Sequence, residues 1–337
     1  MASLRQLFCL AAALPLTIAL GACGGDDGGT VIPAGPHYQT VAKKALVPTN
    51  NNEAREYGLD IGSSSGKLDK TIDNQLGMVL GTLSSMGFDI QGTIDKAVAE
   101  GSIILLVDFQ TPDFTNTTTA GLKVLLGSNP MPAACTGTET YCNTATPPVC
   151  TGCQHHLQGT GNFSIDPNSP DSPPVGGKVI NGTFNGGPGL ISLQIALGGT
   201  TAIQLDLIGA RAKASGITAD KIDSVILAGA LTQDDLNTKV IPAIATQIAP
   251  IITRDCTMPT MPPGCGCTAS STGKTVLDLF DGDITGTTKD CKVTVDEIKG
   301  NSLIQSLLAP DVTIDGKMAL SLGIKIETTK ATFPAQM

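Results

Sequence analysis

Two apolar runs joined by a glycine-rich turn constrain the fold of this chain more than any other feature. Between Ile191 and Leu197 every second residue is a large aliphatic one, and the same alternation resumes from Ile203 to Leu207. The segment between them, Gly198–Thr201, has the composition of a turn. Alternation with a period of two places one face of each strand in a core, and two such runs across a short turn form an antiparallel hairpin. The pattern predicts a sheet with one buried face.

Other apolar segments divide into strands and helices by their length and period. Thr232 precedes two acidic residues and an apolar stripe, which is typical of a capped amphipathic helix with a kink at Pro242. Thr294 and Glu297 have the spacing of a capping box, which predicts the start of another helix. Helices are predicted over residues 72–86, 94–99, 232–252 and 294–308. Further strands are predicted over 102–109, 121–126, 222–231 and 312–333.

Composition narrows the fold class and excludes some functions. The 337 residues include 39 glycines and 21 prolines but only 8 Phe, 3 Tyr and no Trp, which favours many short strands over a helical bundle. We therefore predict an α+β fold, mainly antiparallel β as a sandwich or curved sheet, with a few packed amphipathic helices and disulfide-stapled loops. A net charge of −9 without basic clusters argues against nucleic acid as a partner. The few aromatic rings leave little for stacking sugars or bases.

The N-terminus has the three parts of an export signal. Arg5 is its only charge, an apolar run follows from Leu7 to Leu20, and small residues precede Cys23. The run is short for a membrane-spanning helix and contains Pro15. Residues 20–23, Leu-Gly-Ala-Cys, resemble the lipobox of bacterial lipoproteins. An ordinary secretory signal with a chance cysteine is the alternative.

The resemblance implies that residues 1–22 are removed and that Cys23 becomes a lipidated N-terminus. Such proteins carry a diacylglyceryl group on the sulfur and an acyl chain such as palmitate on the new amino group, and several chains together anchor a protein stably. Gly24 follows the cysteine, where some lipoproteins retained at the inner membrane carry Asp. We therefore expect a lipid-anchored protein of the cell envelope, at the outer membrane.

The rest of the chain is predicted to form a tether and one domain. Residues 23–53 contain no periodic apolar pattern and begin with a Gly/Asp-rich stretch, which predicts a flexible tether behind the lipidated cysteine. Residues 54–337 are predicted to fold as a single α+β domain. Its segment at about 128–160 is rich in Cys, Pro and Gly and is interpreted as an insertion held by disulfides.

Cysteine use supports an oxidising compartment. The chain has ten cysteines, of which Cys9 lies in the signal and Cys23 is assigned to lipid, so that eight remain. An even number in an exported protein predicts disulfides, with two bridges in each of two groups. Cys265 and Cys267 are too close in sequence to pair with each other easily, so both are expected to bond elsewhere. The eight are Cys135, Cys142, Cys150, Cys153, Cys256, Cys265, Cys267 and Cys291.

The segment from Cys150 to His156 places two thiols and two imidazoles within seven residues, which are ligands that zinc uses. Gln154 stands where a c-type haem motif needs histidine, and the surrounding Pro and Gly residues do not suit a thioredoxin-like redox pair. A disulfide-stapled loop is the preferred interpretation, ahead of a metal site and of redox chemistry.

Acidic residues at alternate positions predict a possible calcium site near Asp281, Asp283 and Asp290. The segment from Asp281 resembles the first half of an EF-hand loop, in which carboxylates converge on one hard cation. Its twelfth position is Lys292 where a bidentate Glu belongs. Residues 293–297 look like the second half of such a loop, out of register by five residues.

A second EF-hand-like segment contains Asp311 and Asp315, with Leu322 at its twelfth position. An alternative is strong here, because Asp315-Gly316 between two alternating runs is a preferred hairpin turn. Residues 60–73 are a weaker match to the same pattern.

Catalytic motifs are few. Residues 62–66 match the Gly-x-Ser-x-Gly pattern around Ser64, but a polar run surrounds it where a buried strand and a helix belong. The chain has three histidines, His37, His155 and His156, from which a Ser/His/Asp triad would have to draw. We therefore expect no enzyme activity and no catalytic residues.

The function expected from the sequence is that of a non-catalytic, membrane-anchored envelope lipoprotein that binds an apolar small molecule or an envelope protein. The first alternative is a calcium-stabilised surface or adhesion module, and the second, less favoured one is a serine hydrolase. No cofactor is expected other than calcium, and the oligomeric state does not follow from the sequence.

Overall fold

Ten strands lie in the part of the chain that the computed structural model describes, residues 31–85, 87–139, 152–195, 202–257, 265–282 and 289–335. Most of them are antiparallel, which confirms the predicted α+β class with a mainly antiparallel sheet. The strands are β1 (His37–Leu46), β2 (Leu105–Gln110), β3 (Thr117–Met131), β4 (Gly161–Ile165), β5 (Val175–Ile180), β6 (Thr183–Ile195), β7 (Ile203–Ile217), β8 (Ile222–Thr232), β9 (Val312–Ile314) and β10 (Lys317–Thr332).

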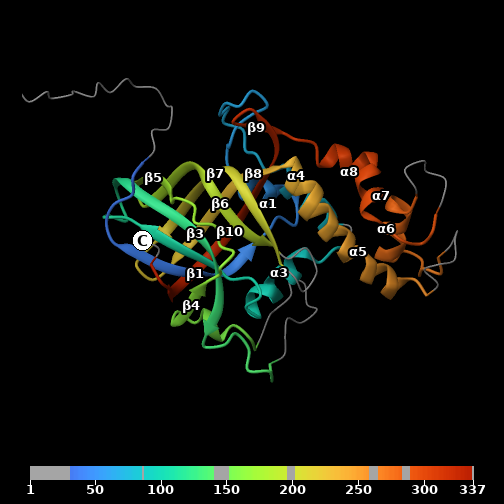
Figure 1. The fold of residues 1–337 in the computed structure, drawn as a ribbon, viewed down its shortest axis with the longest axis horizontal. Coiled ribbons are helices and arrows are strands. Elements are labelled where there is room, and N and C mark those ends of the chain that lie inside the picture. Colours follow the sequence, from blue (N-terminus) through green and yellow to red (C-terminus); the bar gives the residue numbers. More distant parts are fainter. Residues whose placement is uncertain are drawn as a thin grey trace, which may run out of the picture.

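Eight of these strands pair in a closed ring. Starting from β1, each strand is antiparallel to the next in the order β1, β2, β3, β5, β6, β7, β8, β10, and β10 pairs back with β1. Short strands attach at the ends: β4 is antiparallel to β3 and parallel to β10, and β9 extends β10 as a hairpin. The ring lies beside the helices in Figure 1.

Register shifts interrupt the strand pairing at several places. The pairing of β7 with β8 slips between Ile208 and Arg211, where Gly209 has a φ of +59°. A side chain at this glycine would meet Ile314 of β9 at 2.9 Å. Bulges with an added residue increase local twist and let a sheet bend toward closure.

Side chains fill the interior of the ring. The rings of Phe109 on β2 and Phe184 on β6 meet edge to face with 5.3 Å between their centroids. Neither strand pairs with the other, so this contact crosses the interior. Both phenylalanines are fully buried, together with Leu122, Leu193 and Leu207. Buried aliphatic and aromatic surface of this kind is the main stabilising contribution to the fold.

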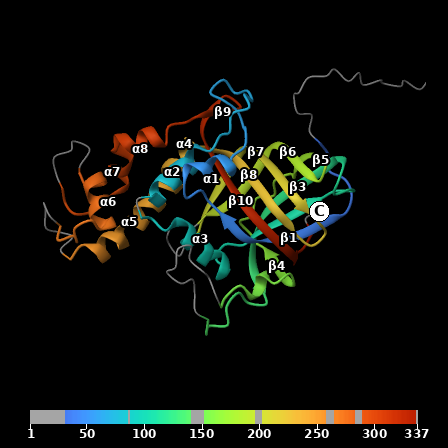
Figure 2. The same ribbon diagram turned by 180° about the vertical axis from the view of Figure 1, so that it is seen from behind.

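Three helices cover the outside of the ring at β10 and β1 (Figure 2). They are α1 (Asn51–Glu56), α2 (Gln75–Ser85) and α3 (Ile90–Ala99). Helix α2 lies on β10, which explains why Ala319–Ile324 is buried without alternation: one face meets the interior and the other meets the helix. The predicted helices at 72–86 and 94–99 are thus confirmed, with shifted starts.

A helical lobe is inserted between β8 and β9 and projects to one side of the ring (Figure 1). The predicted helix at 232–252 is present as three joined segments, and the one predicted at 294–308 is divided at Asn301, which ends one helix and caps the next. The lobe elements are α4 (Gln233–Asp235), the π-helical turn η2 (Leu236–Val240), α5 (Ile241–Asp255), α6 (Thr272–Phe280), α7 (Val295–Gly300) and α8 (Ser302–Leu307).

Disulfides hold the lobe and one loop of the ring. Cys256 is bonded to Cys267 and Cys265 to Cys291, which confirms that the two closely spaced cysteines bond elsewhere. A third bridge joins Cys135 to Cys153, next to the short 3-10 helix η1 (His155–Leu157). Cys142 and Cys150 lie outside the described residues.

The structure corrects the extent of the predicted tether. Residues 37–46 form β1, which closes the ring, and 51–56 form α1, so a tether over residues 23–53 is wrong for these segments. Upstream of β1, the chain lies against two glycines of the sheet. A Cβ atom at Gly176 would lie 2.3 Å from the Val31 carbonyl oxygen, and a Cβ atom at Gly121 would lie 2.3 Å from the Pro33 ring. The chain therefore contacts the outside of the sheet from its first described residues.

Candidate functional site

The described lobe contains a pocket between η2 and α8. It begins at Thr232, whose hydroxyl accepts a hydrogen bond from the Asp235 amide and caps the helical segment. Leu236 and Val240 of the π-helical turn are buried. A π turn widens the helix by one residue and recurs at functional sites, and here it brings Asn237 to the pocket wall.

The other wall comes from α7 and α8. A capping box between Thr294 and Glu297 starts α7, as predicted. Asn301 then ends α7 and caps α8, because its Oδ1 accepts from the amides of Leu303 and Ile304 while its Nδ2 donates to the Leu279 carbonyl over 2.8 Å. This asparagine fixes the angle between the two helices and so the shape of the wall.

The pocket has a volume of about 200 Å³ and combines an apolar floor with a polar rim. Ile241, Ile304 and Leu308 are buried, with 4 to 5% of their surface exposed. Gln233 and Gln305 are exposed. The lining residues are Gln233, Asn237, Ile241, Lys299, Ile304, Gln305, Leu308, Ala309 and Pro310.

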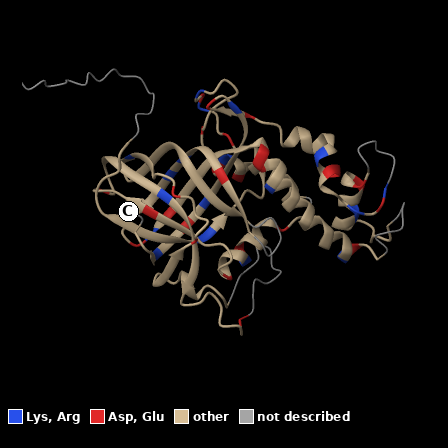
Figure 3. Cartoon of the chain, viewed as in Figure 1, with Lys and Arg blue, Asp and Glu red and all other residues tan. Residues whose placement is uncertain are grey.

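Lys299 is the one charged residue of this lining, so the pocket wall carries a positive charge in an acidic protein. Its ammonium group forms no ion pair with the described carboxylates, and its carbonyl accepts from Gln305 Nε2 over 2.9 Å. The nearby Asp235 instead pairs with Lys239 over 2.7 Å, and this hydrogen bond raises the pKa of Lys239. Elsewhere charges of both signs are dispersed over the ring and lobe (Figure 3).

The acidic residues predicted around Asp281 come together in part. Oxygens of Asp281, Asp290 and Glu297 lie within 4.8 Å of one another. Glu297 belongs to residues 293–297, which lie five residues out of register with an EF-hand loop that starts at Asp281. The fold nevertheless places Glu297 next to Asp281. Asp283 lies outside the described residues.

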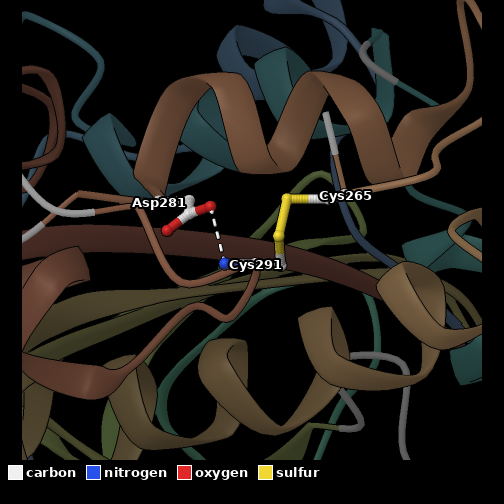
Figure 4. A group of neighbouring side chains, drawn as sticks. All are labelled: Cys265, Asp281 and Cys291. Atoms are coloured by element: carbon white, nitrogen blue, oxygen red, sulfur yellow. Dashed lines mark hydrogen bonds between the residues drawn. A yellow bond between two sulfur atoms is a disulfide. The ribbon is translucent and has the colours of Figure 1, made fainter. Parts of the chain in front are cut away.

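These carboxylates already have protein partners, which limits how well the cluster fits a cation. Asp281 is buried and accepts from the amides of Asp290 and Cys291, at 2.9 and 3.0 Å. Figure 4 shows it beside the disulfide of Cys265, whose sulfur is therefore not a free ligand. Glu297 accepts from the Gly282 and Thr294 amides. Glu297 Oε2 accepts from both the amide and the hydroxyl of Thr294, and Asp290 Oδ1 accepts from the Lys292 amide. A calcium ion therefore fits the oxygen ligand type, but it would share most of these oxygens with hydrogen-bond donors of the protein.

The second predicted pair of acidic residues has structural roles. Asp311 accepts hydrogen bonds from the amide and the hydroxyl of Ser321, which ties the start of β9 to β10. Asp315 has a φ of +49° and stands with Gly316 in the turn between β9 and β10. This is the hairpin turn given above as the alternative to a calcium loop.

The predicted histidine and cysteine cluster contains a disulfide. Cys153 is bonded to Cys135, so its sulfur is not available as a zinc thiolate or as the partner of Cys150. His155 is exposed and contacts Glu139 over 3.0 Å, whereas His156 is fully buried against Phe163. Burial lowers the pKa of His156 to about 4. The hydrogen bond with the Val98 backbone raises this pKa, and the charge of His155 lowers it further, so burial remains the main cause. A disulfide-stapled loop is therefore the interpretation that fits.

The serine of the hydrolase motif lies away from these imidazoles. The Ser64 carbonyl accepts from the Thr313 hydroxyl on β9, whereas His155 and His156 belong to η1 beside β4. In both views β9 lies above the ring and β4 below it (Figures 1 and 2). His37, the remaining histidine, is paired with Asp108 over 2.8 Å.

Cys23, the predicted lipidation site, precedes the first described residue. Among the described residues, no helix has both the length and the apolar character needed to cross a membrane. Comparison with protein families, curated proteins and solved structures finds no match for this chain.

No sequence pattern marks the polar residues of the pocket. Gln233, Asn237, Lys299 and Gln305 are common surface residues at unremarkable spacing. Only the fold of the lobe, which places α7 and α8 across the pocket from α4 and η2, brings them together. The sequence does show the capped starts of the helices at Thr232 and Thr294. These caps place the two helical walls along the chain, but they do not indicate that the walls face each other.

Proposed function

We propose that this protein is a non-catalytic lipoprotein of the cell envelope that is anchored through Cys23 and binds a ligand or partner protein through the lobe pocket. The observation that carries the binding role is the pocket itself, with its apolar floor and a lysine at its wall that forms no ion pair with the described carboxylates. Binding sites in proteins are typically concave and largely apolar, with a few placed polar groups.

The anchoring role rests on the lipobox-like residues 20–23. Removal of residues 1–22 would leave Cys23 only eight residues before Val31, the first described residue. Two or three acyl chains, palmitate among them, would hold the protein to the outer membrane. The ring would then lie close to the membrane surface, because the tether is far shorter than residues 23–53.

The sheet serves as a scaffold in this proposal. We take the closed pairing of eight strands as one curved sheet in preference to a sandwich. Because contacts such as that of Phe109 with Phe184 fill its interior, ligand binding is assigned to the lobe and not to the ring. The separation of Ser64 from the histidines favours binding over hydrolysis.

Fractionation of cells tests the anchor. The wild-type protein should be recovered with membranes, and Cys23→Ser should move it to the soluble exported fraction. Cys9→Ser is the matched control, because this cysteine lies in the segment that would be removed. A Cys23→Ser protein that stays with the membrane would contradict the proposal. Mass spectrometry of molecules extracted from the purified protein would then identify a bound ligand.

A second candidate role, calcium-dependent stabilisation of a surface or adhesion module, is favoured by the convergence of Asp281, Asp290 and Glu297. Millimolar calcium should raise the melting temperature of the wild type. Asp290→Asn should abolish the rise, and Asp296→Asn, an exposed neighbour outside the cluster, should preserve it. An unchanged wild-type melting temperature in calcium would contradict this role.

A further inference from the structure

We infer that the lobe pocket binds a small aliphatic carboxylate, held by Lys299 and the neighbouring side-chain amides. This inference rests on the proposed function, since it names the ligand class of the same pocket. It follows from three features of the described lining: its charge, its free hydrogen-bonding groups and its size.

The charge of the lining selects an anion. Lys299 is half-buried and contributes the pocket's ammonium group. Competing carboxylates nearby are engaged elsewhere: Asp235 with Thr232 and Lys239, and Asp311 with Ser321. No acidic side chain is part of the described lining. A ligand carboxylate would therefore meet a cation with no protein counter-ion to displace, and a charge-assisted hydrogen bond is about twice as strong as a neutral one.

The amide groups supply further contacts. The side chains of Gln233 and Asn237 form no hydrogen bonds within the described structure, so their NH₂ groups are available to a ligand. Gln305 donates one N–H to the Lys299 carbonyl, and its NH₂ group has a second N–H to offer. Amide donors beside an ammonium group suit a carboxylate, which accepts through both oxygens.

The apolar floor and the volume of the pocket limit the chemical character and the size of the rest of the ligand. Ile241, Ile304 and Leu308 present aliphatic surface, and no aromatic ring lines the described pocket. Its volume of about 200 Å³ lies below the roughly 300 to 1,000 Å³ of typical ligand pockets, which favours a small ligand. A carboxylate with a short unbranched chain matches this size, whereas a long fatty acid exceeds it.

Calorimetric titration of the full mature protein in lipid nanodiscs tests the inference, with empty nanodiscs as the blank. The probes are hexanoate and its neutral analogue hexanamide. Hexanoate should bind saturably and about tenfold more tightly than hexanamide. Lys299→Gln should remove that difference, whereas Lys292→Gln, an exposed lysine that is absent from the lining, should preserve it.

Asn237→Phe, which fills the pocket from the helix surface, should abolish binding of both probes while leaving the melting temperature of the protein close to the wild-type value. Equal affinity for the two probes, or no effect of Lys299→Gln, would overturn the carboxylate inference and leave the pocket as a binding site. Failure of both probes to bind the wild type would overturn the carboxylate inference alone. The proposed role of the pocket is contradicted separately, if mass spectrometry finds the same co-purifying molecules with the wild type and with Asn237→Phe.

Discussion

The side-chain amide of Asn74 pairs with the backbone of Gly323 in both directions: its Nδ2 donates to the Gly323 carbonyl over 3.0 Å, and its Oδ1 accepts from the Gly323 amide over 2.8 Å. The pairing of β1 with β10 ends at Lys325, so Asn74 takes the place of a strand neighbour just beyond it. The same side chain bonds to Ala54 and Gly77. It thereby joins α1, α2 and β10.

Asn74→Ala should reduce the free energy of unfolding by about 3 kcal/mol, because it leaves several buried backbone groups without partners. Chemical denaturation measures the loss. Asn52→Ala, at an exposed position in α1, should change it by less than about 0.5 kcal/mol. Equal losses in the two variants would show that the Asn74 network does not stabilise the fold.

Asp73 makes stability fall as pH rises through mildly acidic values. Its buried carboxylate accepts from the amides of Ile61 and Gly62, but burial outweighs these bonds and, with the Asp311 and Asp60 charges, raises the pKa of Asp73 to about 6. The folded state then binds a proton more tightly than the unfolded state, so this contribution is present below about pH 4 and is lost by about pH 6.

Asp73→Asn retains the acceptor oxygen and removes the charge. Relative to wild type, the variant should gain thermal stability between pH 4 and pH 6.5, as measured by melting temperature across that range. Asp296→Asn is the control for loss of a carboxylate at an exposed site. A stability difference between Asp73→Asn and wild type that does not change with pH would contradict the shift.

His156 acts in the opposite direction. With its pKa lowered to about 4 by burial, the folded state binds a proton less tightly than the unfolded state. The contribution of His156 to stability is full above about pH 6.5 and is lost as pH falls toward 4. His156→Leu should flatten the loss of melting temperature on acidification, whereas His155→Gln at the exposed neighbouring position should not. An unchanged acid profile in His156→Leu would refute this role.

The bridge between Cys265 and Cys291 should stabilise the lobe substantially. It closes a loop with a sequence separation of 26 residues, for which the chain-entropy estimate is about 3 to 4 kcal/mol. The double variant Cys265→Ser/Cys291→Ser should lose about this much in chemical denaturation. The Cys135→Ser/Cys153→Ser pair, which opens a loop outside the lobe, should leave amide-exchange protection of α6 and α7 near the wild-type level. Equal protection in both double variants would contradict a specific role for the lobe bridge.

Sequence periodicity was sufficient to predict an element where that element has one buried face. The hairpin of β6 and β7, strand β8 and the capped helices were predicted because apolar residues recur there with a clear period. Strand β1 was missed because its register shifts between Ala42 and Lys44, which breaks the alternation, and because Lys43 and Lys44 give it the appearance of a polar linker.

Strand β5 was missed for a different reason. Gly176 and Gly177 give it a weak strand propensity, yet a side chain at Gly176 would lie 2.3 Å from the Val31 carbonyl. Its glycines follow from a long-range contact that no local pattern contains. The acidic cluster was foreseen at Asp281 and Asp290, but its third member, Glu297, depends on the path of the chain between two helices.

Intact-mass and peptide analysis of the mature N-terminus tests the proposed envelope lipoprotein most directly. The account predicts that the mature chain begins at Cys23, with a diacylglyceryl group on its sulfur and an acyl chain on its amino group. A mature chain that begins at another residue, or an unmodified Cys23, would contradict it.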